Sequence, residues 1–224
     1  MLVLALDTAL DRTAVAVTDG RRISAVRTET MDRGHAERLF PLVAAALAEA
    51  GAEMADIERI VVTTGPGSFT GIRVAIAAAR GLALACGRPV VGVDTLVALA
   101  GSLPERPDGP VLAAIDARRG EIYAGLYDPS GVVIEPPFVA DAEAVLLRIG
   151  DRAAAIVGSG APILAHQAAI TGRRAPPVYP LDGPDPLVLA RLGAAAPAPD
   201  RPPTPLYLRA PDAKPQVPDA GLLR

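Results

Sequence analysis

Apolar and polar residues at the start of the chain follow the pattern of three strands. Residues 2–6, LVLAL, form a continuous apolar run that ends at Asp7, as expected of a strand buried on both faces. Residues 13–18 alternate around the larger Val15 and Val17, and Asp19-Gly20 predicts a tight turn into a third strand at residues 23–27. Three consecutive strands are therefore expected to open the chain.

From Leu39 onward, segments with the periodicity of a helix alternate with segments typical of buried strands. Apolar residues recur at steps of three and four from Leu39 to Ala50, Pro41 predicts a kink or restart, and Gly51 predicts the helix end. The pattern then predicts a buried strand at residues 60–64, a glycine-rich loop, a helix at 70–86, a strand at 90–93 and a short helix capped by Asp94 or Thr95.

The same order of elements begins again after a proline-rich linker at residues 101–110. Asp7 and Asp116 end the first strands of the two halves, and each half places a glycine loop before its second helix. The elements expected in the second half are strands at 111–115, 121–127 and 132–138, a helix at 141–149, a strand at 155–157, the loop GSGAP and a helix after Pro162.

This duplication predicts the fold class. Two such halves facing each other make the duplicated, actin-like fold (ASKHA, ribonuclease H-like) of the α/β class, in which each lobe is a mixed sheet flanked by helices. We expect an N-terminal lobe at residues 1–101, a C-terminal lobe at 102–193 and an extended proline-rich segment at 194–224, anchored by PLYLR at 205–209. The alternative is one ordinary α/β domain with an α+β appendage.

Composition and charge narrow the function classes. The 224 residues carry a net charge of −3, whereas a domain that binds nucleic acid unaided usually has a clustered basic face. A single cysteine, Cys86, excludes internal disulfides and a site with several thiolates. The amino terminus lacks the basic residues of a signal peptide, and Arg80 and Asp94 interrupt the best candidates for a membrane span. We therefore expect a cytoplasmic protein.

The segment TTGPGSFTGIR, residues 63–73, looks like a phosphate-binding loop but matches no common one. A Walker loop needs a lysine after its last glycine, and in a dinucleotide fingerprint the third glycine would fall at position 70 instead of 71. What remains is a strand-to-helix turn in which Ser68 or Thr70 caps the helix and Arg73 lies in its first turn. Such a turn can receive an anion, or it can be a rigid corner that permits close packing.

GPGSFTGIR also resembles the signature shared by the TsaB (YeaZ) and TsaD (YgjD) families, bacterial proteins of threonylcarbamoyladenosine synthesis on tRNA. Other stretches are similar to TsaB in particular: LALDTA at 4–9, HAERLFP at 35–41, DARRGEIYAGLY at 116–127 and the terminal PLYLR. Together they span nearly the whole chain up to Arg209, in the order typical of the family. The chain is therefore identified as a member of the TsaB family.

The resemblance implies that this chain has neither catalytic nor metal-binding residues. TsaD binds a metal through two histidines four residues apart on a helix, whereas here His35 is followed by Leu39, and the other histidine, His166, lies in the other lobe. The phosphate corners are also degenerate, because Ala9 follows the Asp-Thr pair and Arg118-Arg119 occupy the second corner. The remaining candidates for cofactor binding are Asp7, Thr8, Gly65, Gly67, Ser68 and Thr70.

Partner binding is the role that the family resemblance implies. The first two predicted helices could pack against another helix pair, whereas the alternative is that they only cover their own sheet. The implied partners are a TsaD-like catalytic subunit, a TsaE-like ATPase, tRNA through the complex, and a second copy of the chain when TsaD is absent. No cofactor is expected in the chain itself, and a nucleotide at the partner interface stays open. The expected interface residues are His35, Leu39, Leu42, Val43, Ala46, Gly71, Ile72, Ala75, Ile76 and Ala79.

Other function classes stay open beside this one. A stand-alone ATP-dependent kinase would need two intact phosphate corners, and a glycoprotease-like metallopeptidase would need the second histidine. A self-associating scaffold would need no enzyme partner. The resemblance favours an accessory subunit of tRNA N6-adenosine threonylcarbamoyltransferase, which modifies the adenosine beside the anticodon.

Overall fold

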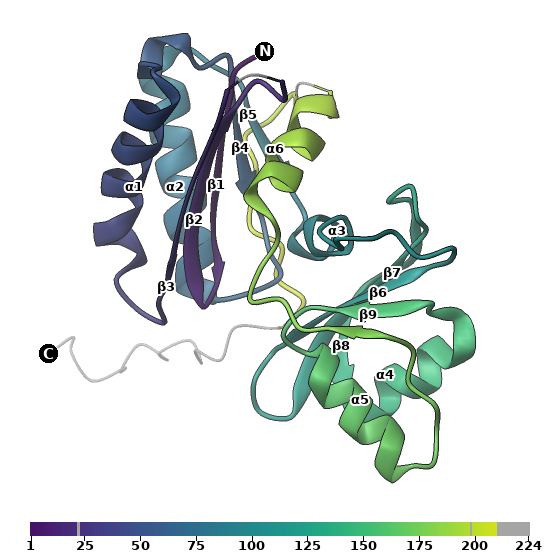
Figure 1. Ribbon diagram of the computed structural model, residues 1–224. Coiled ribbons are helices and arrows are strands. Elements are labelled where there is room, and N and C mark those ends of the chain that lie inside the picture. Colours follow the sequence, from purple (N-terminus) through teal and green to yellow (C-terminus); the bar gives the residue numbers. More distant parts are fainter. Residues whose placement is uncertain (22, 198, 210–224) are drawn as a thin grey trace, which may run out of the picture.

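The protein is described by a computed structural model that covers residues 1–21, 23–197 and 199–209. These residues form two lobes, each built on a five-stranded sheet (Figure 1). The first sheet has the order β3-β2-β1-β4-β5, and the second has the order β10-β9-β6-β7-β8, which is the corresponding order read from the opposite edge. The duplicated two-lobe fold predicted from the sequence is therefore confirmed.

The first sheet combines an antiparallel meander with parallel strands. β1 pairs with β2 antiparallel and with β4 parallel, and β4 in turn pairs with β5 parallel. Helices α1 and α2 cover one face of this sheet (Figure 1). The elements are β1 (Val3–Leu10), β2 (Arg12–Thr18), β3 (Ser24–Thr30), α1 (His35–Ala50), the 3-10 turn η1 (Met54–Asp56), β4 (Arg59–Thr63), α2 (Phe69–Cys86) and β5 (Val90–Val93).

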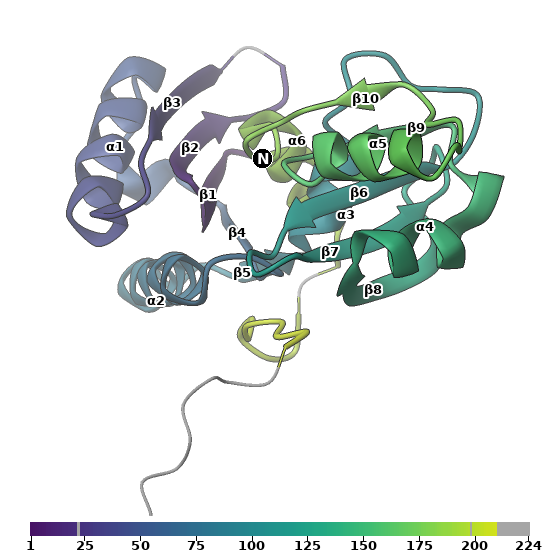
Figure 2. The ribbon, with the colours of Figure 1, turned by 90° about the horizontal axis from the view of Figure 1, so that it is seen from below.

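The second lobe repeats this arrangement. Helices α4 and α5 lie together on one side of its sheet (Figure 2). The elements are β6 (Val111–Asp116), β7 (Glu121–Tyr127), β8 (Val133–Asp141), α4 (Ala142–Ile149), the 3-10 turn η2 (Gly150–Arg152), β9 (Ala155–Val157), α5 (Ala161–Ile170) and β10 (Val178–Tyr179). Thus every strand and helix predicted between residues 111 and 170 is present.

The two lobes exchange the helices that end their repeats. α3 (Thr95–Ala100) follows the first repeat but packs against β6 and β7 of the second lobe. α6 (Pro186–Ala195) follows the second repeat but packs against β1, β2 and β4 of the first lobe, on the face opposite α1 and α2 (Figure 1). Each of these helices therefore packs on the lobe opposite to the one in whose expected range, 1–101 or 102–193, most of its residues fall.

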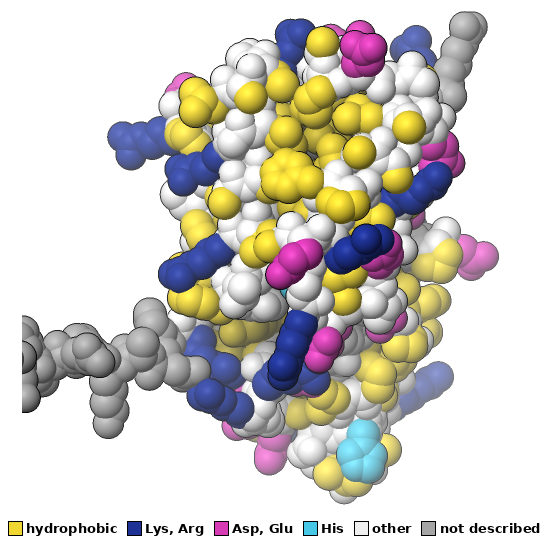
Figure 3. All heavy atoms as spheres, turned by 90° about the vertical axis from the view of Figure 1, so that its left-hand side faces the viewer, with side chains coloured by type: hydrophobic (Ala, Val, Ile, Leu, Met, Phe, Trp, Pro, Cys, Tyr) yellow, Lys and Arg dark blue, Asp and Glu magenta, His cyan; other side chains and the backbone are white. Residues whose placement is uncertain are grey.

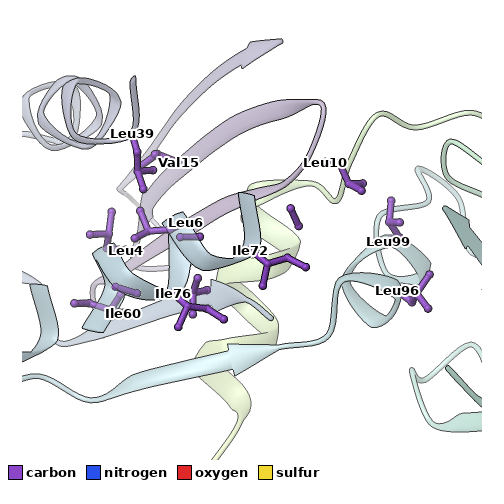
Figure 4. Close-up of a cluster of buried hydrophobic side chains, with 14 of the residues drawn as sticks. Leu4, Leu6, Leu10, Val15, Leu39, Ile60, Ile72, Ile76, Leu96 and Leu99 are labelled. Atoms are coloured by element: carbon purple, nitrogen blue, oxygen red, sulfur yellow. The ribbon is translucent and has the colours of Figure 1, made fainter. Parts of the chain in front are cut away.

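A shared hydrophobic core follows from this exchange. Leu4, Leu6, Ile60 and Ile76 pack between the first sheet and its helices, and Leu96 and Leu99 of α3 extend the same cluster toward the second lobe (Figure 4). The cluster continues to Ile115 and Tyr127 on β6 and β7. Each buried leucine or isoleucine contributes about 1.5–3 kcal/mol relative to an exposed one, so the core holds both lobes together.

Several boundaries differ from those expected. β1 does not end at Asp7 but continues to Leu10 through an irregular register, and α1 begins at His35 and runs through Pro41 as one helix. α2 is also continuous through Arg80, so by length and composition it is long and apolar enough to cross a membrane. The expectation that no apolar run reaches that length is therefore wrong. α2 nevertheless packs one face against β1 and β4.

Candidate functional site

A cleft of about 720 Å³ lies between the lobes. It is lined by the turn between β1 and β2, the glycine loop before α2, the turn between β6 and β7, and the segment from Leu206 to Arg209. This volume falls in the range of small-molecule sites. Any group that binds a ligand in this cleft would have to come from these loops.

The glycine loop is a packing corner. A Cβ on Gly71 would lie 1.9 Å from the carbonyl oxygen of Thr8, and one on Gly67 would lie 2.2 Å from that of Ala9. The Thr8 hydroxyl donates to the Gly71 carbonyl at 2.6 Å, and the Ser68 amide donates to the Ala9 carbonyl at 2.7 Å. The two glycines thus allow the start of α2 to rest directly on the β1 backbone. Of the two readings of this turn, close packing is the one that these contacts support.

The second lobe repeats this corner. A Cβ on Gly158 would lie 2.3 Å from the carbonyl oxygen of Ala114, and that carbonyl accepts a hydrogen bond from the Gly160 amide at 3.0 Å. The Ser159 hydroxyl accepts from the Asp116 amide at 3.1 Å. In both lobes, therefore, the glycines bring a helix start onto the end of the first strand.

Asp7 is fully buried beneath the first corner. Its Oδ1 accepts from the Ala9 amide at 3.0 Å and from the Thr63 hydroxyl at 2.8 Å. Its Oδ2 lies 3.7 Å from Nη2 of Arg12, and that guanidinium also donates to the carbonyl of Pro184. Asp7 is absent from the cleft lining, so its observed contacts are internal.

The other residues predicted for cofactor binding differ in their exposure to solvent. Thr8 and Gly65 are buried, whereas Ser68 and Thr70 are exposed at the start of α2. Ser68 is the N-cap, since its hydroxyl accepts from the Gly71 amide at 3.3 Å. Only Gly67 and Ser68 of the predicted set line the cleft.

Arginine side chains occupy the second corner. Arg118 and Arg119 both have positive φ, at 61° and 58°, which is uncommon for residues with a side chain. Nη2 of Arg118 donates to Oδ2 of Asp11 in the opposite lobe at 2.6 Å, while its Nη1 lies 3.5 Å from Oδ2 of Asp116. The Arg118 side chain therefore crosses the cleft where a nucleotide-binding relative would need small residues.

The histidines do not form the metal site known from the resemblance. His35 is buried at the start of α1, with Nδ1 2.8 Å from the Thr13 hydroxyl, and Leu39 one turn later is also buried. His166 is exposed on α5 of the other lobe. Among the described residues, no three His, Cys, Asp or Glu side chains gather as metal ligands do. The residues present therefore do not fit that metal.

The residues expected at a partner interface are part of the chain's own core, which is a correction to their assignment. All of them are buried in the chain, because the apolar faces of α1 and α2 pack against the first sheet. The buried set is His35, Leu39, Leu42, Val43, Ala46, Gly71, Ile72, Ala75, Ile76 and Ala79. An interface on these helices remains a prediction, and it would have to use their other faces.

Those other faces carry a second set of apolar residues. Figure 3 shows hydrophobic side chains gathered over the α1 and α2 side of the first lobe. Phe40 is 51% exposed and Leu84 is 88% exposed. The α1–α2 outer face, as we define it, comprises Ala36, Phe40, Pro41, Ala44, Ala45 and Ala48 of α1 with Phe69, Ala77, Gly81, Leu84 and Ala85 of α2.

A cluster at the end of this face was missed by the sequence reading. The rings of Phe69 and Tyr207 are 5.4 Å apart, and Arg73 lies over the Phe69 ring at 3.6 Å. Tyr207 belongs to the PLYLR segment, whose expected anchoring role fits the hydrogen bond from the Leu206 amide to the Thr64 carbonyl at 2.8 Å. The only sequence signal was the presence of both aromatic residues in the quoted motifs.

Comparisons with known proteins agree with this fold. The family model described as TsaD, tRNA N6-adenosine threonylcarbamoyltransferase, matches residues 22–154. The tRNA threonylcarbamoyladenosine biosynthesis protein TsaB of Escherichia coli is 40% identical over 135 residues, which cover 59% of this chain and 58% of that protein.

Solved structures extend the likeness to the whole fold. YeaZ of Pseudomonas aeruginosa is 32% identical and superposes with a TM-score of 0.75, covering 92% of this chain and 99% of that one. The activator of 2-hydroxyisocaproyl-CoA dehydratase from Clostridium difficile, solved with ADPNP, is 11% identical with a TM-score of 0.51, covering 86% of this chain and 94% of that one. At 11% identity, the likeness to the dehydratase activator shows the fold alone.

Proposed function

The chain belongs to the TsaB (YeaZ) family, and from this we propose that it is a non-catalytic partner subunit in threonylcarbamoyl transfer to the adenosine beside the anticodon of tRNA. It acts by binding a TsaD-like catalytic subunit and supporting it. A TsaE-like ATPase and tRNA join through that complex, and a second copy of the chain takes the partner's place when the catalytic subunit is absent. The complex is cytoplasmic.

The observation that carries this proposal is the α1–α2 outer face. Its apolar residues do not contribute to the core, which is complete beneath both helices. Ala77, Gly81 and Ala85 are small, so the backbone of another helix can approach α2 closely. A contiguous apolar patch of this kind is the usual mark of a protein interface.

The chemistry of the partner follows from the family. The TsaD family model matches a range that includes α1 and α2, so a TsaD-like subunit carries an equivalent pair of helices. Two such pairs can pack as four helices around one seam. The outer face of α2 suits that arrangement, because Ala77 and Gly81 allow close approach at its centre while Phe69 and Leu84 offer larger contacts toward its ends.

Several contacts support a role without chemistry of its own. The loops that would hold phosphate are used for packing at Gly67, Gly71 and Gly158, and Arg118 fills the second corner. We therefore propose that the chain alone holds no cofactor, and that any nucleotide binds at the partner interface. Phe69 lies at the border of the cleft and the α1–α2 outer face, so such a nucleotide could reach both.

Co-purification with the TsaD-like subunit of the same organism tests the proposal. Leu84→Arg places a charge in the apolar seam, so we expect it to abolish the complex and the threonylcarbamoyl transfer that depends on it. Leu147→Arg on α4 is the matched control, because Leu147 is 60% exposed on the second lobe. Equal capture of the catalytic subunit by the wild type and both variants would refute the proposal.

A separate assay addresses the enzyme alternatives. The purified chain is titrated with ATP and incubated with peptide substrates in the presence of divalent metal. We expect neither saturable ATP binding nor cleavage. Saturable activity in either assay would replace the proposed role with that of a kinase or a metallopeptidase.

A further inference from the structure

The Tyr207 cluster, defined as Phe69, Arg73 and Tyr207, is a group of side chains in mutual contact on the molecular surface. Nε of Arg73 donates to the Tyr207 hydroxyl at 2.7 Å, and the guanidinium lies 3.6 Å from the centre of the Phe69 ring and 5.6 Å from that of Tyr207. Phe69 is nevertheless 48% exposed and Tyr207 40% exposed. Two aromatic rings that contact each other and Arg73 thus present part of their surface to solvent.

The position of Tyr207 does not depend on its ring. It lies in the C-terminal strap, residues 203–209, which is held on either side of it. Before Tyr207, Pro203 rests in the space that a Cβ on Gly92 would fill, and the Leu206 amide bonds to Thr64. After it, Arg209 forms an ion pair with Glu121 in the second lobe. The strap therefore has its own attachments to both lobes.

The Tyr207 cluster continues the outer face of α2. Phe69, Arg73, Ala77, Gly81 and Ala85 follow one another at four-residue steps, and all are exposed. Residues four apart are neighbours on a helix surface. A partner helix laid along the small residues of α2 would therefore meet the Tyr207 cluster at one end.

The chemistry of the Tyr207 cluster is that of an interface anchor. Tyrosine and arginine are enriched among the residues that dominate binding energy, especially when they are fixed before the partner arrives. α2 contains no acidic residue, and within the described part of the chain no carboxylate lies within ion-pair distance of Arg73 or Arg80. A facing element that carries carboxylates would complement both arginines.

We propose that the C-terminal strap is part of the partner interface, with Tyr207 as its anchor against a carboxylate-bearing element of the TsaD-like subunit. This inference rests on the proposed function, since it takes the same partner. It adds a segment that is far from α1 and α2 in the sequence, and it assigns Tyr207 a direct contact.

The test measures the dissociation constant of the full chain with the TsaD-like subunit. We expect Tyr207→Ala to weaken binding about tenfold or more, as truncation of an anchoring aromatic does. Arg209→Ala is the matched control: it changes the same strap on the side away from α2, and we expect less than about a threefold effect. Thermal unfolding of each variant checks that the fold is intact.

Two further variants test the roles of the Tyr207 ring and of Arg73, and comparison with Leu84→Arg distinguishes failure of the anchor from failure of the proposed function. Tyr207→Phe keeps the ring and should bind nearly as well as the wild type, whereas Arg73→Gln should reduce the dependence of binding on salt concentration. If Leu84→Arg abolishes binding while Tyr207→Ala binds like the wild type, the anchor is refuted and the proposed function stands. Equal losses for Tyr207→Ala and Arg209→Ala would also refute the anchor, because strap placement alone would explain them.

Discussion

Gly71→Ala tests whether the glycine loop is a packing corner. Gly71 is in the first turn of α2, where its backbone conformation is helical and suits any residue. The added Cβ, however, would lie 1.9 Å from the Thr8 carbonyl oxygen, about 1.5 Å closer than ordinary contact. Because Thr8 is fully buried and also bonds to Gly71, neither side can move freely.

The magnitude follows from this overlap. Overpacking a core usually costs about 1–3 kcal/mol, and here the clash is between backbone and Cβ instead of between flexible side chains. We therefore expect Gly71→Ala to lower the free energy of unfolding by about 4 kcal/mol, in the range that marks a specific structural cause.

Gly81→Ala is the matched control on the same helix. Gly81 is exposed, and no atom lies within 4 Å of the Cβ that it would gain. Alanine inside a helix is more favourable than glycine by about 0.5–1 kcal/mol, so this variant should be more stable than the wild type. Urea unfolding followed by circular dichroism measures both variants.

The two results decide between packing and anion binding. A Gly71→Ala protein within about 1 kcal/mol of the wild type would show that α2 does not rest on the β1 backbone. The loop amides would then be free to bind phosphate, and a nucleotide site in this lobe would become possible.

Two buried groups near α3 yield further predictions. Burial raises the pKa of Asp94 from 3.8 to about 6, so the folded state binds this proton more tightly than the unfolded state, and the contribution of Asp94 to the free energy of unfolding should rise by about 2 kcal/mol as pH falls from 7 to 4. Asp94→Asn keeps a capping side chain and should be more stable at pH 7, with its advantage disappearing near pH 4; a constant advantage in urea titrations would contradict this. The Tyr127 hydroxyl is buried with no hydrogen-bond partner among the described residues, so Tyr127→Phe should raise the free energy of unfolding by about 1 kcal/mol. A fall in the thermal midpoint of that variant would reveal a partner for the hydroxyl.

The strands and the duplication could be predicted because their signals are local. Buried strands such as β4 and β9 are short apolar runs, and Gly51 and Gly87 end their helices in the left-handed conformation expected of glycine. The repeated order of elements then restricted the topology, since each half makes the same sheet.

The elements that were missed depend on distant contacts. α6 lies in a proline-rich stretch, although Asp185 and Pro186 are typical cap and first residues of a helix. Its stability comes from the first sheet, where Gly193 packs on Val61. The range 210–224 of the expected extended segment lies outside the described residues.

Residues of the core face of α1 and α2 were assigned to the partner interface for a related reason. An apolar stripe with helical period identifies the face that packs, but it does not say against what. On α1 and α2 the strongest stripe covers the chain's own sheet, as the alternative reading held. The outer face is less hydrophobic because alanine and glycine dominate it. Only the structure distinguishes this face from the one that packs on the sheet.

The glycine loop links the packing of the first lobe to the surface proposed for partner binding. Gly67 and Gly71 seat the first turn of α2 on β1, and that turn holds Phe69 and Arg73 in the positions where they meet Tyr207. A loop that resembles a phosphate cradle thereby fixes the geometry of a surface on the other side of the helix. The same close approach seats the turn from which Phe69 and Arg73 reach Tyr207, and an exposed aromatic group that is held in place before binding loses little entropy when a partner arrives. In this chain, the loop therefore contributes to function by positioning the surface that carries Phe69 and Arg73.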